Sequence, residues 1–444
     1  MKNIIALMFD VSQRWRCLTA TLLFLACAVG CSENAKTKPE TPASAATQET
    51  KPSTEASAPK ESAEQKIPLD KVSIDLTPEE ISAGWISLFD GVSLWGWSPN
   101  SETKWSVSDG AIVAEAENPP GMLMTLVPFA DYELRAEVKL AKGGNSGLFL
   151  RTVRNPKDPA VDCYELNVCD SHPAFPTGSL VARVKPDREV KGDDRWLPIE
   201  VRLEGARMVV KMDGEQVLDY TDDNAARRTS GLIGLQMNGG KVEFRKIALR
   251  PLGLASIWNG EDLTGWRVVP ESKTEFTFAD GELKGQGGLG FLETEQTWGN
   301  FVLQFAGKVN VKSDNSGIFF RSQAGTDAKA YNGYELQIQN DVTDGDLTKP
   351  ANFGTGAIFR RVPARRVTAK DFEWFHSTLV AYDDQFLVWV NGELVTAWKD
   401  DRAADDNPRK GLRLTPGHLA IQAHDPTSDV SFRDLKVGEL PTEP

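Results

Sequence analysis

The chain has 444 residues and a formal net charge of −13, from 63 acidic and 50 basic side chains. This acidic balance argues against a polyanion such as nucleic acid as partner. Only four histidines are present, and no Walker loop, dinucleotide glycine fingerprint or His-Glu-x-x-His string occurs, so the sequence predicts no cofactor and no metal site.

Residues 1–31 are expected to be a targeting segment. Two arginines precede an apolar run over 18–29 that is short for a membrane span. Residues 28–32, Ala-Val-Gly-Cys-Ser, resemble a bacterial lipobox. We expect cleavage before Cys31, lipid attachment to its thiol, and export to the cell envelope, in the periplasm or at the outer membrane. The alternative is ordinary signal cleavage that releases a free protein.

Residues 32–70 consist of Ala, Thr, Ser, Glu, Lys and Pro with almost no large apolar side chain. Such a segment cannot bury enough apolar surface to fold. It therefore predicts a disordered tether between a lipid anchor, which would be the chain's only link to the membrane, and folded domains.

The rest of the chain is expected to be all-β. Apolar and polar residues alternate with period two over 132–140, 199–203, 208–212, 301–311 and 386–390. Asp-Gly or Asn-Gly pairs at 109, 213, 280 and 391 supply turns between such strands. Apart from a turn at 78–83, no clean helical period occurs. Many short strands of this kind predict an antiparallel sandwich or jelly roll.

The strand region is a duplication. Asn-Ser-Gly-Leu-Phe-Leu-Arg at 145–151 returns as Asn-Ser-Gly-Ile-Phe-Phe-Arg at 315–321. The offset between copies is 169–170 at first, then 178, then 186–188, so insertions are expected in two loops. Such a period is a whole domain, since solenoid units repeat at about 20–50 residues. We predict two tandem sandwiches, at 71–252 and 253–440.

Alternation also assigns faces to the repeated strand. Ile318 and Phe320 share the core face, which leaves Gly317, Phe319 and Arg321 on the outer face, as Phe149 and Arg151 are in the first copy. An aromatic ring beside an arginine has two readings. In the first, the arginine pairs with a carboxylate across strands on a solvated face. In the second, the face binds carbohydrate: the ring stacks on a sugar and the guanidinium binds its oxygens.

The next strand places acids and amides in one row. These are Glu335, Gln337, Gln339 and Asp341 in the second copy, and Glu165 and Asn167, followed by Asp170 and His172, in the first. Such a row near an arginine is typical of a polyol-binding groove, although a satisfied polar network has the same composition.

Together these strings resemble the bacterial 3-keto-disaccharide hydrolase family. The motifs are Leu88-Phe89-Asp90-Gly91 with Trp97, the Asn-Ser-Gly-x-Phe-x-Arg string, Gly333-Tyr334-Glu335-Leu336-Gln337, the two Thr-Gly pairs, and the closing string at 231–245. The resemblance implies a concanavalin-like or laminin-G-like jelly roll over nearly all of 83–252 and 255–439. Such jelly rolls often carry calcium, but no acidic loop here has a calcium-binding spacing.

The resemblance also implies a reaction. A ketone at C3 of a glycoside acidifies the proton on C2; a base removes that proton, the C1 substituent leaves by β-elimination, and water adds back. Arg321 and Arg151 match the family arginine and would hold the substrate oxygen. Glu335 and Glu165 match the family glutamate and would be the base or a polar anchor. Gln337 keeps the family glutamine, which Asn167 replaces in the first copy.

At the family aspartate position the copies differ. The first copy keeps Asp170, with His172 after it, whereas the second has Asn340 with Asp341 adjacent. The residues expected to bind substrate are Phe319, Gln337, Gln339, Phe149 and Asn167. Two other functions stay open at this point: a non-catalytic carbohydrate-binding lipoprotein, and a structural or adhesive envelope protein. Neither the glycosidic linkage nor the oligomeric state follows from the sequence.

Overall fold

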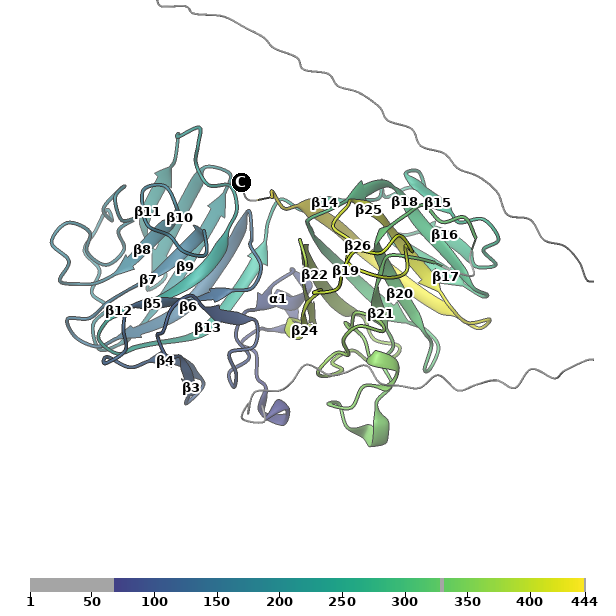
Figure 1. The fold of residues 1–444 in the computed structure, drawn as a ribbon, viewed down its shortest axis with the longest axis horizontal. Helices are drawn as coiled ribbons and strands as arrows, with labels where there is room; N and C mark the ends of the chain where they lie inside the picture. The colour runs from purple at the N-terminus through teal and green to yellow at the C-terminus, as the bar shows by residue number, and fades with distance from the viewer. Residues whose placement is uncertain (1–67, 328–330, 443–444) are drawn as a thin grey trace, which may run out of the picture. The chain divides into compact units, whose positions relative to one another are not determined.

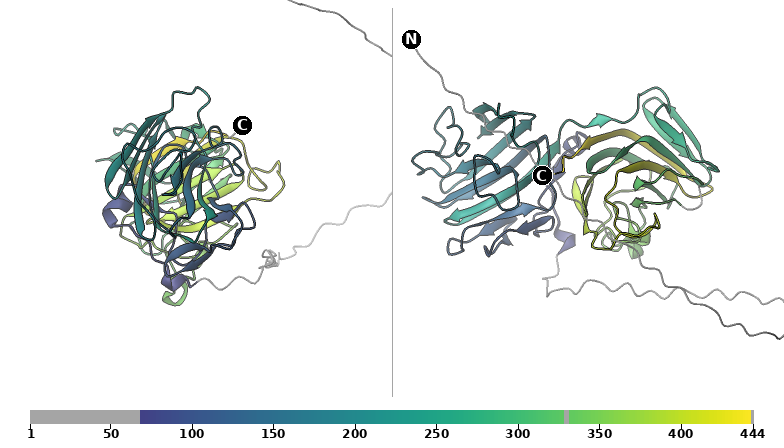
Figure 2. Two further views of the ribbon diagram at one scale, coloured as in Figure 1. Left: turned by 90° about the vertical axis from the view of Figure 1, so that its left-hand side faces the viewer. Right: turned by 45° about the horizontal axis from the view of Figure 1, so that its top comes forward.

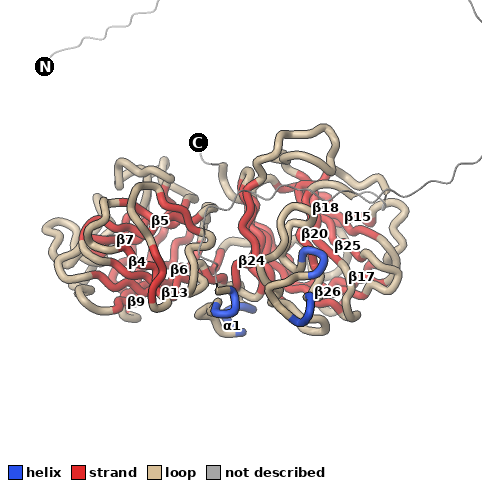
Figure 3. Tube along the Cα trace, turned by 60° about the horizontal axis from the view of Figure 1, so that its bottom comes forward, coloured by secondary structure: helices blue, strands red, loops and turns tan. Residues whose placement is uncertain are grey.

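The computed structural model describes residues 68–327 and 331–442, and these form two β-sandwiches (Figure 1). Within this part of the chain, helix is limited to α1 (Pro78–Ser82) and the 3-10 turns η1 (Leu69–Lys71), η2 (Thr343–Gly345) and η3 (Ala351–Phe353) (Figure 3). None of these helices is long and apolar enough to cross a membrane. The expected signal segment with Cys31 lies outside the described residues, as does the tether except for its last three residues, where η1 begins.

The first sandwich packs an eight-stranded sheet against a five-stranded one (Figure 2). The larger sheet has the order β11-β10-β9-β6-β13-β4-β3, with β1 beside β13, and the smaller one β2-β5-β12-β7-β8. The strands are β1 (Ile86–Ser87), β2 (Trp97–Pro99), β3 (Ser106–Ser108), β4 (Ala111–Ala114), β5 (Gly121–Thr125), β6 (Tyr132–Leu140), β7 (Asn145–Thr152), β8 (Tyr164–Val168), β9 (Trp196–Glu204), β10 (Arg207–Met212), β11 (Glu215–Thr221), β12 (Leu232–Gly239) and β13 (Val242–Pro251).

The second sandwich repeats this topology strand for strand. Its sheets have the orders β16-β17-β26-β19-β22-β23-β24, with β14 beside β26, and β15-β18-β25-β20-β21. The strands are β14 (Ala255–Ser256), β15 (Trp266–Val268), β16 (Glu275–Ala279), β17 (Glu282–Gln286), β18 (Gly290–Trp298), β19 (Phe301–Val309), β20 (Ser316–Ser322), β21 (Tyr334–Ile338), β22 (Phe375–Tyr382), β23 (Gln385–Val390), β24 (Glu393–Lys399), β25 (Gly417–Ala423) and β26 (Asp429–Glu439).

The all-β prediction and the duplication are therefore confirmed. The first insertion forms η2 and η3, between β21 and β22, and the second lengthens the loop from β24 to β25. Neither interrupts a strand. This is expected, because a loop can grow at small entropic cost whereas an extra residue in a paired strand disturbs every later contact.

The cores form where the alternation predicts. Along β6 every second residue is buried, from Tyr132 to Leu140. In β20, Ile318 and Phe320 are completely buried between the two sheets of the second sandwich. Period-two alternation places such side chains on one face of a strand, and the two sheets bury those faces against each other.

Candidate active site

The outer face of the five-stranded sheet in the second sandwich carries a cavity of about 540 Å³. Strands β18, β20, β21 and β25 form its floor, and the loops after β21 and β24 form its walls. Its lining combines aromatic, amide and basic side chains with a single carboxylate. These residues are Leu289, Phe291, Asn315, Phe319, Tyr331, Gly333, Tyr334, Glu335, Phe359, Arg360, Arg361, Asn407, Arg409, Lys410, Gln422 and His424.

Glu335 is the carboxylate in this cavity. It is half-buried on β21, opposite Phe319 of β20, and its side chain lies over Gly317. Among the described residues its carboxylate has no hydrogen-bond or ion-pair partner. Burial raises the pKa of Glu335 to about 8, and Arg360 opposes that rise. Because it costs free energy to keep an unpartnered buried carboxylate charged, this group takes up a proton readily near neutral pH.

Three aromatic rings form a rigid side of the cavity. Phe291 and Tyr331 stack with their ring centroids 4.3 Å apart, and Phe319 meets both edge-on at 5.5 and 5.0 Å. The Tyr331 hydroxyl donates to Glu293 at 2.6 Å, and Arg267 pairs with the same carboxylate. The three rings are only 2–7% exposed, so they form an apolar wall that is fixed by their packing against one another. The prediction that Phe319 lies on the outer face, beside Glu335, is confirmed.

Two amides complete the floor of the cavity. Asn315 accepts a hydrogen bond through Oδ1 from Gln337 Nε2 at 3.0 Å, so its own amide nitrogen is available to a ligand. Gln422 is 5% exposed, and its Oε1 has no hydrogen-bond partner within the described part of the chain. An unsatisfied buried acceptor that lines a cavity indicates a site for a hydroxyl or a water molecule.

Arg321 does not face this cavity, contrary to the prediction. Its φ is +49°, and the pairing between β20 and β25 shifts register between Phe319 and Ser322. This bulge turns the side chain away from the outer face. The buried guanidinium donates to the carbonyls of Gly299, Asp383 and Arg413 at 2.6–2.9 Å and to Asn300 Oδ1 at 3.0 Å. Arg321 therefore ties together loops at the end of the sandwich. Its side chain is only 2% exposed and does not line the cavity, so it cannot bind a substrate there.

The rest of the polar row is hydrogen-bonded within the protein and forms no groove, although the buried Oε1 of Gln337 has no partner among the described residues. Gln337 is fully buried and donates to Asn315 and to the carbonyl of Asn352 in η3. Gln339 and Asp341 hydrogen-bond each other at 2.8 and 2.9 Å. Gln337, Gln339 and Asp341 do not line the cavity. The prediction that they bind substrate or act on it is corrected, because the first insertion covers their part of the sheet.

The first sandwich has no equivalent free carboxylate. Glu165 is 8% exposed, and Gln236, the counterpart of Gln422, donates to it at 3.3 Å. Where the second copy has Arg360, the first has Ala182, and both residues adopt left-handed backbone conformations. Phe149 packs into a small apolar cluster with Met122, Met124, Cys163 and Leu232. Burial raises the pKa of Glu165, and no cation among the described residues opposes that rise.

Four other predicted residues of the first copy have structural roles. Arg151 repeats the bulge, with φ +45°, and its side chain is 1% exposed and bonded to three carbonyls and Asp131. Asn167 donates to the Phe175 carbonyl. Asp170 accepts from the Thr177 hydroxyl and from two backbone N–H groups. His172 accepts two backbone N–H bonds at Nδ1, so its basic lone pair is occupied. The predicted catalytic or binding roles of these four residues are corrected.

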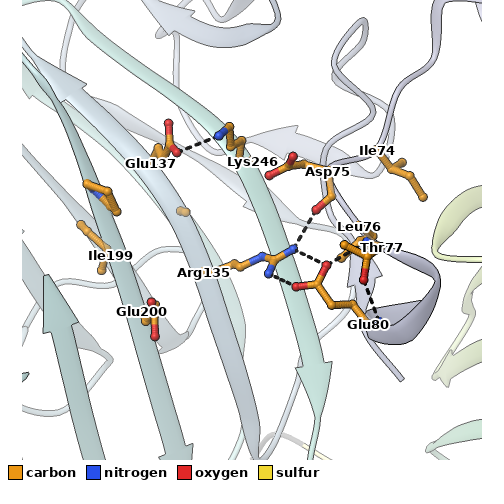
Figure 4. A pocket seen from close by; sticks show the side chains of 12 residues that line it. Ile74, Asp75, Leu76, Thr77, Glu80, Arg135, Glu137, Ile199, Glu200 and Lys246 are labelled. Atoms are coloured by element: carbon orange, nitrogen blue, oxygen red, sulfur yellow. Dashed lines mark hydrogen bonds and ion pairs between the residues drawn. The ribbon is translucent and has the colours of Figure 1, made fainter. Parts of the chain in front are cut away.

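A second cavity, of about 440 Å³, lies on the outer face of the eight-stranded sheet of the first sandwich (Figure 4). The segment 74–80 forms one wall, fixed by Thr77, which caps α1, and by Glu80, which pairs with Arg135. Glu137 pairs with Lys246 at 3.0 Å. Because these carboxylates are held by cations, they are poor candidates for a base.

Sequence reasoning missed most of the cavity walls. Arg360 and Arg361 occupy the positions of Ala182 and Arg183, shortly after the repeated Thr-Gly pair, whereas Arg409 and Lys410 belong to the loop that the second insertion lengthens. The contrast between the copies could have found them: an arginine replaces Ala182 at position 360, and the second insertion lengthens the loop that carries Arg409 and Lys410.

Three comparisons place the chain among known proteins. A model of the 3-keto-α-glucoside-1,2-lyase-like domain matches it twice, over residues 84–250 and 253–438. A 3-keto-disaccharide hydrolase of Bacteroides thetaiotaomicron is 25% identical, over 38% of this chain and 79% of that protein.

Among solved structures, a candidate glycosyl hydrolase from Parabacteroides distasonis is 21% identical with a TM-score of 0.36, over 40% of this chain and 98% of that one. A Bacillus subtilis carbohydrate-binding module is 17% identical with a TM-score of 0.28, over 35% of this chain and 95% of that one.

Proposed function

Because this chain belongs to the 3-keto-α-glucoside-1,2-lyase-like domain family, we propose that it is an enzyme that cleaves 3-keto-glycosides, as the name of its Bacteroides relative says of that protein. We place the active site in the second sandwich. The observation that carries this assignment is Glu335, a carboxylate without a partner among the described residues, in a cavity with aromatic rings and beside a cation.

The chemistry needs a base near C2 of a 3-keto sugar. Glu335 removes the C2 proton, and the electron pair of that C–H bond delocalises onto the C3 oxygen as an enolate. The enolate then reforms the C3 ketone, and its electron pair forms the C1=C2 double bond as the bond from C1 to the aglycone oxygen breaks. The aglycone takes up a proton, either from the Glu335 carboxyl or from water. Water then adds across the double bond, with hydroxyl at C1 and hydrogen at C2, so the net result is hydrolysis. A raised pKa suits this role, because a base is most effective when its pKa lies near the operating pH.

Negative charge develops on the C3 oxygen as the proton leaves. Arg321, expected to stabilise this charge, does not line the cavity, and its guanidinium binds three carbonyls and Asn300 at the end of the sandwich. Arg360 takes this role in our proposal, because it lines the same cavity and acts electrostatically on Glu335. A cation aimed at a developing oxyanion lowers the barrier more than it stabilises the neutral ketone.

The first sandwich is proposed to be inactive in this reaction. Its glutamate, Glu165, is tied to Gln236, and Ala182 stands where Arg360 supplies the charge. Removing Glu165 as a base should therefore leave turnover intact, which makes this copy an internal control for the second.

We also propose that the enzyme is exported and anchored in the cell envelope by a lipid on Cys31. The support is the signal-like segment and the lipobox-like string at 28–32. Fractionation of a Cys31→Ser variant tests this proposal.

The decisive assay incubates the purified chain with 3-keto-trehalose or 3-keto-sucrose and measures the released sugar. Glu335→Gln keeps the side-chain shape but removes its basicity, so we expect a loss of about 10²–10⁴-fold in kcat. Glu165→Gln is the matched control and should retain activity. Wild-type protein that releases no sugar, or a Glu335→Gln variant as active as wild type, would refute the assignment.

A further inference from the structure

We propose that the active-site cavity selects glycosides whose aglycone carries a negative charge, such as a hexuronate. This inference rests on the proposed function, since it concerns the substrate of the same site. It is carried by four basic side chains that line the cavity: Arg360, Arg361, Arg409 and Lys410. None of the four forms an ion pair with any residue in the described ranges, in a chain whose formal net charge is −13.

A comparison of the two copies shows why Arg361 has no ion-pair partner among the described residues. In the first sandwich Tyr164 donates to Asp222 at 2.8 Å, and Arg183 lies 4.4 Å above the Tyr164 ring and 4.0 Å from the same aspartate. Its guanidinium also donates to the carbonyls of Pro159 and Ala160. The first-copy arginine is therefore bound to an acid, a ring and a neighbouring loop.

In the second sandwich a different arginine, Arg402 in the loop with the second insertion, pairs with the equivalent aspartate, Asp400. Tyr334 donates to Asp400 at 2.5 Å, and Arg402 pairs with that aspartate at 2.6 and 2.7 Å. The first copy has Asn224 where the second has Arg402. Because Arg402 pairs with Asp400, Arg361, the counterpart of Arg183, forms no ion pair with this aspartate and interacts with it only electrostatically at longer range.

Arg361 then connects the two loops that carry the other cations. Its guanidinium donates to the carbonyls of Arg360 and Arg409, each at 3.1 Å. Arg360 follows β21, whereas Arg409 and Lys410 belong to the lengthened loop before β25. Arg361 is thus a positioning residue that holds both loops at one rim of the cavity.

The arrangement leaves positive charge that the protein does not neutralise. Like charges at one rim repel one another, and an anion bound between them relieves that repulsion. Near neutral pH, Glu335 holds a proton for much of the time, because its pKa is about 8. It therefore offsets only part of the positive charge, and a neutral disaccharide would add no counter-ion to a rim where none of the four cations is ion-paired to a described residue.

The test compares two 3-keto-glucosides that differ only in the aglycone, glucose against glucuronate. We expect wild-type kcat/KM to be higher for the glucuronate compound, with a preference that declines as salt is added. In the double variant Arg409→Gln/Lys410→Gln, the ratio of kcat/KM for the anionic to the neutral substrate should fall about tenfold, the scale for losing two partly exposed charge contacts. Equal wild-type kcat/KM values, or an unchanged ratio in this variant, would overturn the inference.

A control with the same change of charge is Lys211→Gln/Lys284→Gln, which alters two exposed lysines of β10 and β17 that do not line the cavity. It should keep the wild-type ratio. Binding of the corresponding unoxidised disaccharides, measured by calorimetry, separates this inference from the proposed function. If no keto-sugar is turned over but the glucuronate disaccharide still binds more tightly, only the proposed reaction fails. If turnover occurs and neither measurement depends on the charge of the aglycone, only the anion preference fails.

Discussion

The activity and the stability of the protein should depend on the ionisation of Glu335 in opposite directions. Burial raises the pKa of this carboxyl from 4.5 to about 8. At pH 7 about a tenth of the protein then holds the charged base, and at pH 9 about nine-tenths does. If Glu335 is the base, kcat/KM on a 3-keto substrate should rise about tenfold between these pH values and level off above them.

The same shift has the opposite sign for stability. Between pH 4.5 and about 8 the folded protein keeps a proton that the unfolded chain has lost, so the free energy of unfolding falls as pH rises through this window. The full shift corresponds to about 5 kcal/mol at 1.36 kcal/mol per pKa unit. Glu335 is half-buried and reached by water, so we expect about 2 kcal/mol.

Chemical denaturation and pH–rate profiles of wild type and Glu335→Gln measure both effects. The variant has nothing to titrate at this position, so its stability should exceed that of wild type by an amount that grows by about 2 kcal/mol from pH 5 to pH 9. Its residual activity should show no rise near pH 8. Parallel stability curves together with a flat wild-type rate profile would refute the argument that this carboxyl is buried, unpartnered and catalytic.

Three further predictions address individual residues. Arg321→Ala removes a buried guanidinium that donates to three carbonyls, so it should lower stability by about 3–5 kcal/mol and Tm by about 10 °C, measured by calorimetry; an unaltered Tm would contradict the structural role. Arg360→Ala removes the charge that holds down the pKa of Glu335, so the pH–rate profile should shift to higher pH while kcat falls about 10²-fold; an unshifted profile would exclude that contact. Cys31→Ser should move the protein from the membrane fraction to a soluble or uncleaved product, and unchanged fractionation would reject the anchor.

The sequence alone determined the architecture, because period-two alternation and turn pairs are local signals. The repeated strings then required both halves to share one topology, and the offsets between copies located both insertions in loops. The sequence also predicted that Phe319 and Glu335 lie on the outer face of one sheet. That inference held because the alternation along β20 is unbroken up to Phe319 and because β21 pairs with β20 in regular register.

The tertiary structure decided which of the polar residues can act. A bulge at Arg321 reverses the alternation of inward and outward side chains along β20. The local sequence does not predict this bulge, because the residue with left-handed backbone is an arginine and not a glycine. The destination of a loop is likewise set by distant contacts, so only the folded chain places Arg409 and Lys410 over Glu335's cavity. The availability of Glu335 is also a tertiary property. Gln236 donates a hydrogen bond to Glu165, whereas no described residue does so for Glu335. Both glutamates stand in the same Tyr-Glu-Leu motif, so the sequence alone cannot show which of them is free to act as a base.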